Sequence, residues 1–315
     1  MKPVLFASTK PLDRAENMSA VFHAYQGRKV HLQVDPWRRH PAIECGDFDL
    51  MVIDEYPTET PGKAILLWHA IDGGKTVGLL QPRPYFHASQ TRLITRVVTS
   101  GTGTVDLVSR QDGVPAEAVM PLGTPRTDAY IGKRKGDGHT PLAGKRSYLY
   151  VPTFRTGNEP PLPDIDWDWL DRNLTDDELF VVKPHMMTKG ILDRQRKHIR
   201  EIPSSEPSAP YLYDCDVVVT DYSSIIFDGY LLGKPGILFE KRRGYVETRG
   251  MSMTYPDRYC SRYCASEEEL LHLCRSATAL TGVERNCLRT VADRCDGHAT
   301  ERVCRLIEEM AGGVA

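Results

Sequence analysis

Two adjacent serines, Ser223 and Ser224, belong to the string Asp-Tyr-Ser-Ser, which is the most informative part of the sequence about a ligand site. They follow three valines at residues 217–219, a run typical of a parallel strand buried on both faces. Residues 225–232 have helical spacing, so the serines are expected at the start of a helix beyond the carboxyl end of that strand. Hydroxyls, backbone N–H groups and the helix dipole favour an anion there, usually phosphate. The alternative is that Ser223 only caps the helix and Asp221 only forms the turn, but the whole Asp-Tyr-Ser-Ser string favours a ligand site.

His69 follows the apolar strand predicted at residues 64–67 and precedes a Gly-rich loop that contains Lys75. An imidazole titrates near neutrality and can take a proton from a hydroxyl nucleophile. The adjacent glycines would let the backbone approach a ligand, and Lys75 could meet an anion. The alternative is a structural histidine that hydrogen-bonds the loop, and the spacing does not decide between the two.

Lys183 and His185 repeat this arrangement after a strand predicted at residues 179–182. A cation and an imidazole at the end of a buried strand could neutralise a diphosphate and stabilise a leaving group. Taken alone, the string is more typical of a capped loop with a solvated lysine.

Two arginines lie on either side of residues 132–146, a stretch rich in Gly, Lys and Arg that is typical of an interdomain linker. Arg126 belongs to the string Gly-Thr-Pro-Arg-Thr-Asp, and Arg155 belongs to Pro-Thr-Phe-Arg. The planar guanidinium group suits phosphate. The alternative for the first string is an Arg126–Asp128 pair that braces a turn.

Strand and helix patterns alternate on both sides of this linker. Strands are predicted at residues 4–7, 30–34, 50–53, 64–68, 96–99, 147–151, 179–182 and 217–219, and helices at 14–25, 105–111, 165–173 and 225–232. The C-terminal segment has helical patterns. The fold class is therefore predicted as α/β, with two Rossmann-like domains facing a cleft and a helical C-terminus.

Composition narrows the classes of protein. A chain of 315 residues suggests two domains, and a formal net charge of −2 argues against bulk nucleic-acid binding. Neither a signal peptide nor an apolar run long enough to cross a bilayer is found in the sequence. We therefore expect a cytoplasmic location, with peripheral contact at the inner face of the plasma membrane as an open possibility.

The cysteines crowd the C-terminal quarter of the chain, where Cys260 and Cys264 are spaced like a metal-binding pair. No second close pair or nearby histidine completes a zinc site. Buried free thiols are the favoured interpretation.

Taken together, these strings resemble the CDP-glycerol glycerophosphotransferase family, which includes the teichoic-acid polymerases and primases. The shared strings occur in the family's order, as WHAIDGGK, GTPRTD, PTFR, KPH, TDYSSIIFDGYLLGKP and a closing DGHATERV. The Ser-Ser string is the most specific of them, and the others gain weight from their order. Ala70 and Met186 depart from the Gly and Pro that are common at their positions.

The resemblance implies a GT-B fold, with the acceptor side in residues 1–140 and the CDP-linked donor in residues 141–315; the C-terminal helix could pack back on the first domain. It also implies transfer of glycerol phosphate, or a related alditol phosphate, from CDP-glycerol or CDP-ribitol with release of CMP. The acceptor would be a hydroxyl of a cell-surface glycan, such as a teichoic acid or capsule polysaccharide, or of its lipid-linked precursor.

The resemblance also implies roles for individual residues. His69 would deprotonate the acceptor hydroxyl, and His185 would assist the donor phosphates. The diphosphate would be held by Ser223 and Ser224. Further contacts to the donor or the cleft are expected from Asp221, Arg126, Arg155 and Lys183, and more weakly from Lys75 and Asp128. No carboxylate cluster marks a metal site, so no tightly bound metal is expected, while loosely held Mg²⁺ stays possible.

Two other functions fit the same patterns. One is a GT-B glycosyltransferase that uses a nucleotide sugar, because fold alone does not fix the reaction. The other is a non-catalytic nucleotide-binding module that keeps the cleft without turnover.

Substitutions at the two kinds of site should separate their roles. We expect His69→Ala to abolish transfer while leaving donor binding largely intact, because only the proton acceptor is removed. Ser223→Ala combined with Ser224→Ala should weaken donor binding instead. Steady-state rates and donor titrations measure both, and a His69 variant with its full rate would refute the general-base role.

Overall fold

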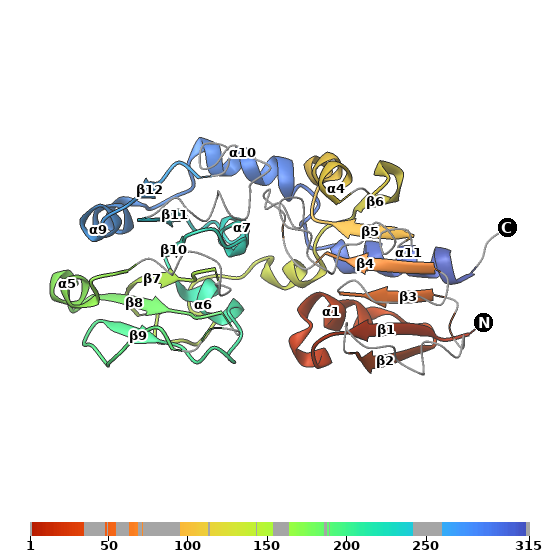
Figure 1. The fold of residues 1–315 in the computed structure, drawn as a ribbon, viewed down its shortest axis with the longest axis horizontal. Helices are drawn as coiled ribbons and strands as arrows, with labels where there is room; N and C mark the ends of the chain where they lie inside the picture. The colour runs from red at the N-terminus through yellow and green to blue at the C-terminus, as the bar shows by residue number, and fades with distance from the viewer. Residues whose placement is uncertain are drawn as a thin grey trace. The chain divides into compact units, whose positions relative to one another are not determined.

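The computed structural model describes residues 2–34, 48, 50–54, 63–68, 71, 95–112, 114–142, 144–153, 164–185, 188, 190–241 and 260–312. The chain divides into two compact units (Figure 1). Unit 1 comprises Met1–Ile131 and Thr290–Ala315, and unit 2 comprises Gly132–Arg289. The chain passes from unit 2 back to unit 1 within α10 (Gly282–Val291).

Unit 1 contains a six-stranded sheet in the order β2-β1-β3-β4-β5-β6, in which every neighbouring pair is parallel. The strands are β1 (Val4–Ser8), β2 (Lys29–Gln33), β3 (Leu50–Ile53), β4 (Lys63–Leu67), β5 (Arg96–Thr99) and β6 (Val119–Pro121). The order reverses between β1 and β3, which makes this pair the topological switch point of the sheet.

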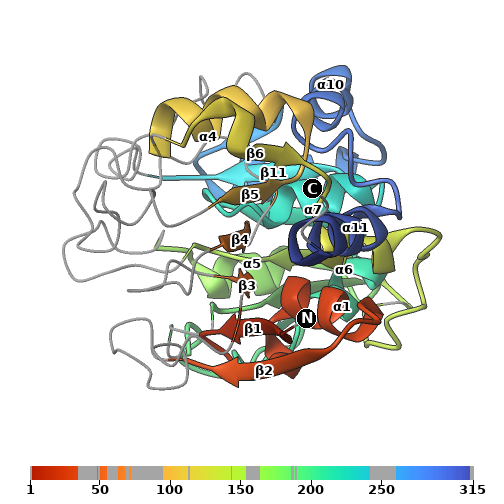
Figure 2. The ribbon, with the colours of Figure 1, turned by 90° about the vertical axis from the view of Figure 1, so that its right-hand side faces the viewer.

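Helices cover both faces of this sheet, as the alternation of side chains along β1 demonstrates. Val4 and Phe6 pack with α1 (Glu16–Ala24) and α11 (Ala299–Gly312), which lie side by side (Figure 2). Leu5 and Ala7 point to the opposite face and join the cluster that contains Val108 of α4 (Val105–Asp112). Short 3₁₀ helices complete the unit: η1 (Leu12–Arg14), η2 (Thr102–Thr104), η3 (Ala116–Ala118) and η4 (Pro125–Tyr130).

Unit 2 contains a second parallel six-stranded sheet, in the order β12-β11-β10-β7-β8-β9. Its strands are β7 (Arg146–Tyr150), β8 (Glu178–Val182), β9 (Ile199–Glu201), β10 (Val217–Thr220), β11 (Gly236–Phe239) and β12 (Tyr263–Cys264). Numbered within the unit, this is the Rossmann order 3-2-1-4-5-6, with its switch point between β7 and β10.

The sheet of unit 2 is also covered on both faces. Leu170 of α5 (Trp167–Asn173) and Leu270 of α9 (Glu267–Ser276) pack in one cluster with alternate strand residues such as Val217 and Val219. Val218 points to the other face, where α6 (Ala209–Asp214) and α7 (Ile225–Leu231) lie. The valine run is thus buried on both sides, as its composition indicates.

The segment predicted as a linker is fastened to unit 2. Asp214, a buried carboxylate at the end of α6, accepts hydrogen bonds from the backbone N–H groups of Gly136, Gly138 and Thr140 at 2.8, 3.0 and 2.7 Å. Burial alone raises the pKa of Asp214, but these bonds outweigh it and lower the pKa. Gly138 allows close packing here, because a Cβ on this residue would lie 2.0 Å from the carbonyl oxygen of Pro210.

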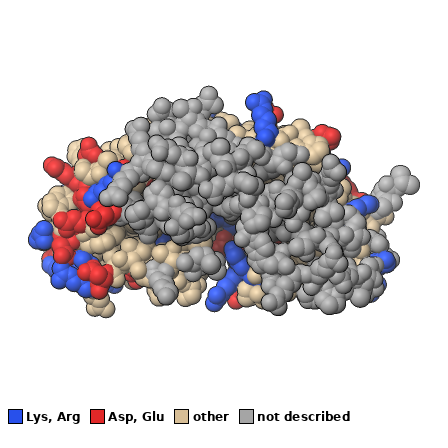
Figure 3. Space-filling view, in the orientation of Figure 1, with Lys and Arg blue, Asp and Glu red and all other residues tan. Residues whose placement is uncertain are grey.

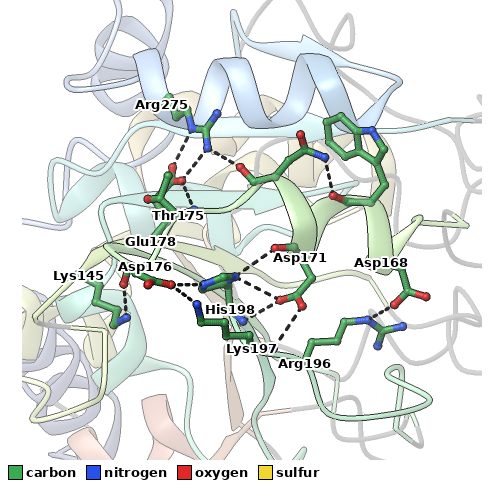
Figure 4. A network of polar contacts seen from close by, with 12 residues as sticks. Lys145, Asp168, Asp171, Thr175, Asp176, Glu178, Arg196, Lys197, His198 and Arg275 are labelled. Atoms are coloured by element: carbon green, nitrogen blue, oxygen red, sulfur yellow. Dashed lines mark hydrogen bonds and ion pairs between the residues drawn. The ribbon is translucent and has the colours of Figure 1, made fainter.

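A network of ion pairs covers the amino-terminal edge of the unit 2 sheet (Figure 4). Glu178, the first residue of β8, accepts hydrogen bonds from Arg275 at 2.7 and 2.9 Å and from the Tyr148 hydroxyl at 2.6 Å. His198, just before β9, lies 2.9 Å from the Asp176 carboxylate. Acidic and basic side chains are intermixed over the end of the unit that carries α5 and α9 (Figure 3). This edge is opposite the one at which the sequence motifs follow their strands.

Glu178 is nearly completely buried, so its charge depends on the hydrogen bonds that it accepts. Burial alone would raise its pKa, but the hydrogen bonds from Arg275, Tyr148 and Thr175 lower it to about 2. Its contribution to stability is therefore fully present above about pH 4.5, the ordinary value for glutamate, and is lost as the pH falls toward 2.

We expect Glu178→Gln to lower the free energy of unfolding by about 1.5–3 kcal/mol at neutral pH, because charged acceptors make the stronger hydrogen bonds. The difference from the parent should shrink as the pH falls below 4.5. Urea unfolding at several pH values measures both effects. Asp106→Asn is the control. It also removes a carboxylate from an ion pair, but Asp106 is 79% exposed and its partner Arg110 is 82% exposed, so little change in stability is expected. Equal stability of the Glu178 variant and the parent at pH 7 would contradict the prediction.

Candidate functional site

The motif strings of unit 2 meet at the carboxyl edge of its sheet. In the parallel register, Val219 of β10 pairs with Tyr150 of β7, which pairs with Val182 of β8. The strings Asp-Tyr-Ser-Ser, Pro-Thr and Lys-Pro-His follow these strands within a few residues. Ligands of open α/β sheets bind beyond this edge at the switch point, which here lies between β7 and β10.

Asp221 connects the two loops on either side of the switch point. Its side chain is fully buried, and Oδ1 accepts hydrogen bonds from the backbone N–H groups of Thr153 at 2.8 Å and Tyr222 at 2.6 Å. Thr220 adds a second connection, because its hydroxyl donates to the Val151 carbonyl at 2.6 Å. Asp221 thus holds the loop after β7 to the loop after β10, and these two loops flank the candidate site.

Ser223 and Ser224 are half-buried at the start of α7, as the sequence predicts. The Ser223 hydroxyl accepts the backbone N–H of Ile225 at 3.4 Å, and the Ser223 N–H donates to the Thr220 hydroxyl at 3.2 Å. The Ser224 hydroxyl makes no capping hydrogen bond. Gly229 lets α7 approach β10 closely, since a Cβ there would lie 2.7 Å from Cγ2 of Val218. The serines are therefore held close to the end of β10.

Lys183 is buried at the end of β8 and is not the solvated lysine that its string alone suggests. It is only 4% exposed, and Nζ donates to the carbonyl oxygens of Pro184 at 3.0 Å and Ser204 at 3.1 Å. Burial lowers the pKa of Lys183, while the charge of Glu206 opposes this effect. His185 is half-buried two residues later, and its carbonyl accepts the N–H of Thr188. The lysine places a buried positive charge at the carboxyl edge.

Arg126 and Asp128 of unit 1 both contact other elements of that unit. The Arg126 guanidinium group donates to the Tyr130 hydroxyl at 2.7 Å and lies 3.7 Å from the Glu16 carboxylate. Asp128 accepts the N–H groups of Ala299 at 3.0 Å and Thr300 at 2.7 Å, and so caps the start of α11. Asp128 therefore joins the string Gly-Thr-Pro-Arg-Thr-Asp to the C-terminal helix.

The same string meets the closing Asp-Gly-His-Ala-Thr string through close backbone packing. Gly123 has a φ of +96°, and a Cβ there would lie 2.2 Å from the carbonyl oxygen of Arg294. Arg302 donates to the Leu122 carbonyl at 2.8 Å and to Asp296 at 2.7 Å. These two motifs thus act together in fastening the end of the chain to unit 1.

The remaining predicted site residues, His69, Lys75 and Arg155, lie outside the described residues. The residue before His69 is described: Trp68 is buried, and its N–H donates to Val98 of β5 at 3.1 Å. Asn17, which no local pattern in the sequence marks, donates to the Trp68 carbonyl. Its burial and its hydrogen bonds to distant backbone groups identify it in the structure.

The described part of the chain also bears on metals, thiols and membranes. Within it, no group of three or more His, Cys, Asp or Glu side chains could hold a metal ion. Its cysteines are free, and burial raises the pKa of Cys260 to about 11, as expected for unreactive thiols. None of its helices combines the length and the apolar character that a membrane crossing needs.

The two parallel α/β units match a solved structure over nearly the whole chain. The H548A variant of the wall teichoic acid polymerase TagF superposes with a TM-score of 0.76 and 14% sequence identity, covering 99% of this chain and 89% of that one. The protein therefore has the α/β, GT-B-like architecture that the sequence predicts, with helices near the C-terminus.

The chain belongs to the CDP-glycerol:poly(glycerophosphate) glycerophosphotransferase family, whose model matches residues 53–309. A teichoic acid poly(ribitol-phosphate) polymerase of Bacillus spizizenii is 27% identical over 280 residues, which cover 81% of this chain and 45% of the relative. The ribitol-phosphate polymerase TarK of Staphylococcus aureus is 25% identical over 292 residues, covering 79% and 57%. The chain thus spans about half the length of these relatives.

The role of Asp221 beneath the site can be tested directly. Asp221→Ala should lower the free energy of unfolding by about 1–3 kcal/mol and speed hydrogen exchange at the Thr153 amide, because a buried N–H loses its acceptor. Glu201→Ala is the matched control, since Glu201 also accepts two backbone N–H groups, from Ile191 and Leu192, both at 2.7 Å. That control should leave the Thr153 amide protected. Parent-like exchange at Thr153 in the Asp221 variant would show that the connection is unimportant.

Proposed function

We propose that this protein transfers an alditol phosphate from a CDP-activated donor to a hydroxyl group of a glycan or its lipid-linked precursor, releasing CMP. The observation that carries the proposal is the meeting of three motif loops at the carboxyl ends of β10, β7 and β8, beside the switch point. Such an edge is where a Rossmann-like sheet receives a nucleotide. Membership of the glycerophosphotransferase family supports transfer of an alditol phosphate as the reaction at this edge.

The donor is proposed to be CDP-glycerol or CDP-ribitol. The family description refers to glycerophosphate, whereas the two relatives act on ribitol phosphate according to their names. One TagF structure is described as an H444N variant with CDPG after a 15 minute soak. These observations support a CDP-alditol and leave both alditols in the proposal.

The proposed step forms one bond and breaks one bond at phosphorus. The acceptor hydroxyl oxygen attacks the phosphorus that carries the alditol, and the bond from that phosphorus to the bridging oxygen of the diphosphate breaks. CMP leaves with the electron pair, and His69 takes the hydroxyl proton. A transfer of this kind needs positioning and charge neutralisation more than covalent help from the protein.

The residues of unit 2 fit the donor side of this step. The half-buried hydroxyls of Ser223 and Ser224 can donate to the diphosphate oxygens, and His185 can assist the leaving phosphate. Lys183 is engaged with carbonyl oxygens, so we propose that it acts through its positive charge. Because that charge is buried, its field at the carboxyl edge is weakly screened. Arg155 stays a proposed donor contact, and loosely held Mg²⁺ stays compatible with the step.

The proposed identity of the acceptor is supported by the names of the two relatives, which are teichoic acid polymerases. We therefore propose a cell-envelope glycan as the acceptor, with action at the cytoplasmic side of the membrane, where lipid-linked precursors are exposed. The pair Arg126 and Asp128 is proposed to support the acceptor-side loops, since both residues brace unit 1 in the structure.

A donor panel tests the proposal. The full chain is incubated with CDP-glycerol, CDP-ribitol and several nucleotide sugars, with and without Mg²⁺, in the presence of lipid-linked glycan acceptors. We expect CMP release and a product heavier than the acceptor by one or more alditol phosphates, measured by mass spectrometry. Release of UDP or CDP with transfer of a sugar would favour a glycosyltransferase, and binding without any turnover would favour a non-catalytic module. Either result would overturn the proposed transfer.

A further inference from the structure

The side chain of Asn17 connects the two unit 1 motifs. It belongs to the first turn of α1 and is only 6% exposed. Nδ2 donates to the carbonyl oxygen of Trp68 at 3.0 Å, and Oδ1 accepts the backbone N–H of Arg126 at 2.9 Å. The first contact spans 51 residues of sequence and the second spans 109. One amide group therefore joins the end of β4 to the Pro-Arg string of η4.

Both contacts are made to the backbone at points where function is proposed. The Trp68 carbonyl belongs to the peptide group that joins Trp68 to His69, the proposed proton acceptor. The Arg126 N–H begins the segment whose carboxylate, Asp128, caps α11. A planar peptide group transmits the orientation of its carbonyl to the next residue, because rotation about the C–N bond is restricted.

The two contacts need one donor and one acceptor on the same side chain, and an amide supplies both. A carboxylate could accept from Arg126 but could not donate to Trp68, and an aliphatic side chain could do neither. Asparagine is also a weak helix former, so α1 gains nothing from it as a helix residue. Its buried position is therefore explained by these two contacts and not by helix propensity.

We infer that Asn17 is a positioning residue for the transfer reaction, setting the backbone that presents His69 and holding it in register with the Arg126 segment. This inference rests on the proposed function and adds to it a residue that touches no substrate. Misplacement of a reacting group by about 1 Å can cost on the order of 100-fold in rate. A positioning role thus affects kcat more than donor binding, which is proposed to lie in unit 2.

Three variants of the full chain test the inference. Asn17→Leu removes both contacts with little change in size. Asn17→Asp keeps the acceptor for Arg126 and loses the donor to Trp68. Thr104→Val is the matched control, because it also removes a buried hydrogen bond in unit 1, from the Thr104 hydroxyl to the Gly101 carbonyl at 2.6 Å, away from the motifs.

We expect kcat to fall about 10- to 100-fold in both Asn17 variants, with the KM for the CDP-alditol within about twofold of the parent. Thr104→Val should keep the parent kcat at temperatures well below unfolding. Unchanged kcat in Asn17→Leu or in Asn17→Asp, with an active parent, would overturn the inference and leave the proposed function standing.

Hydrogen exchange gives a readout that does not depend on activity. Peptides that contain Trp68 and Arg126 should exchange faster in Asn17→Leu than in Thr104→Val, and the Arg126 amide should stay protected in Asn17→Asp. If the parent turns over no CDP-alditol, the proposed function fails, and exchange alone decides whether Asn17 positions these segments. Equal exchange in Asn17→Leu and Thr104→Val would refute that positioning.

Discussion

The hydrogen bond from the Thr153 N–H to the Asp221 carboxylate is the contact on which the candidate site depends, because it spans the switch point of unit 2. Unit 1 uses the same device at its own switch point. Asp54, directly after β3, accepts the N–H of Thr9, directly after β1, at 3.1 Å. In each sheet a carboxylate that follows one strand holds the loop that follows the other. Such a bond resists the separation of the two loops that flank the switch point.

Buried charges are satisfied by backbone groups at several places in the molecule. Asp214 receives N–H groups from the segment that begins unit 2, and Lys183 donates to two carbonyl oxygens. A buried charge without such partners would be strongly unfavourable, so each of these residues favours the loop conformation that supplies its partners. Buried side chains therefore hold these loops in place.

Local patterns in the sequence predicted most of the described strands and the helix that begins after the two serines. They did not predict the strand order or most contacts between distant residues, and the ligand site at the serines stays a prediction. The strand expected at residues 96–99 is β5, and that expected at 50–53 is β3, because β-branched and aliphatic runs determine both. The order 3-2-1-4-5-6 depends on pairing between distant strands, which no local pattern encodes. The predicted linker begins where the boundary between the two units falls, but its composition did not show that Gly138 packs closely against Pro210 and Asp214. Asn17 was missed because its partners are distant in sequence.

Unit 1 is assembled from two pieces of chain, since Thr290–Ala315 joins Met1–Ile131 and supplies α11 to its core. During synthesis the whole of unit 2 emerges from the ribosome before this last helix does. Unit 2 can therefore complete its fold while one face of the first sheet is covered by α1 alone, although domains generally fold from the N-terminus onward. Val303 and Ile307, both fully buried, are the residues that close that face. The nascent protein must carry an exposed apolar surface until α11 has been made, and removal of residues 303–307 would damage the unit that was translated first.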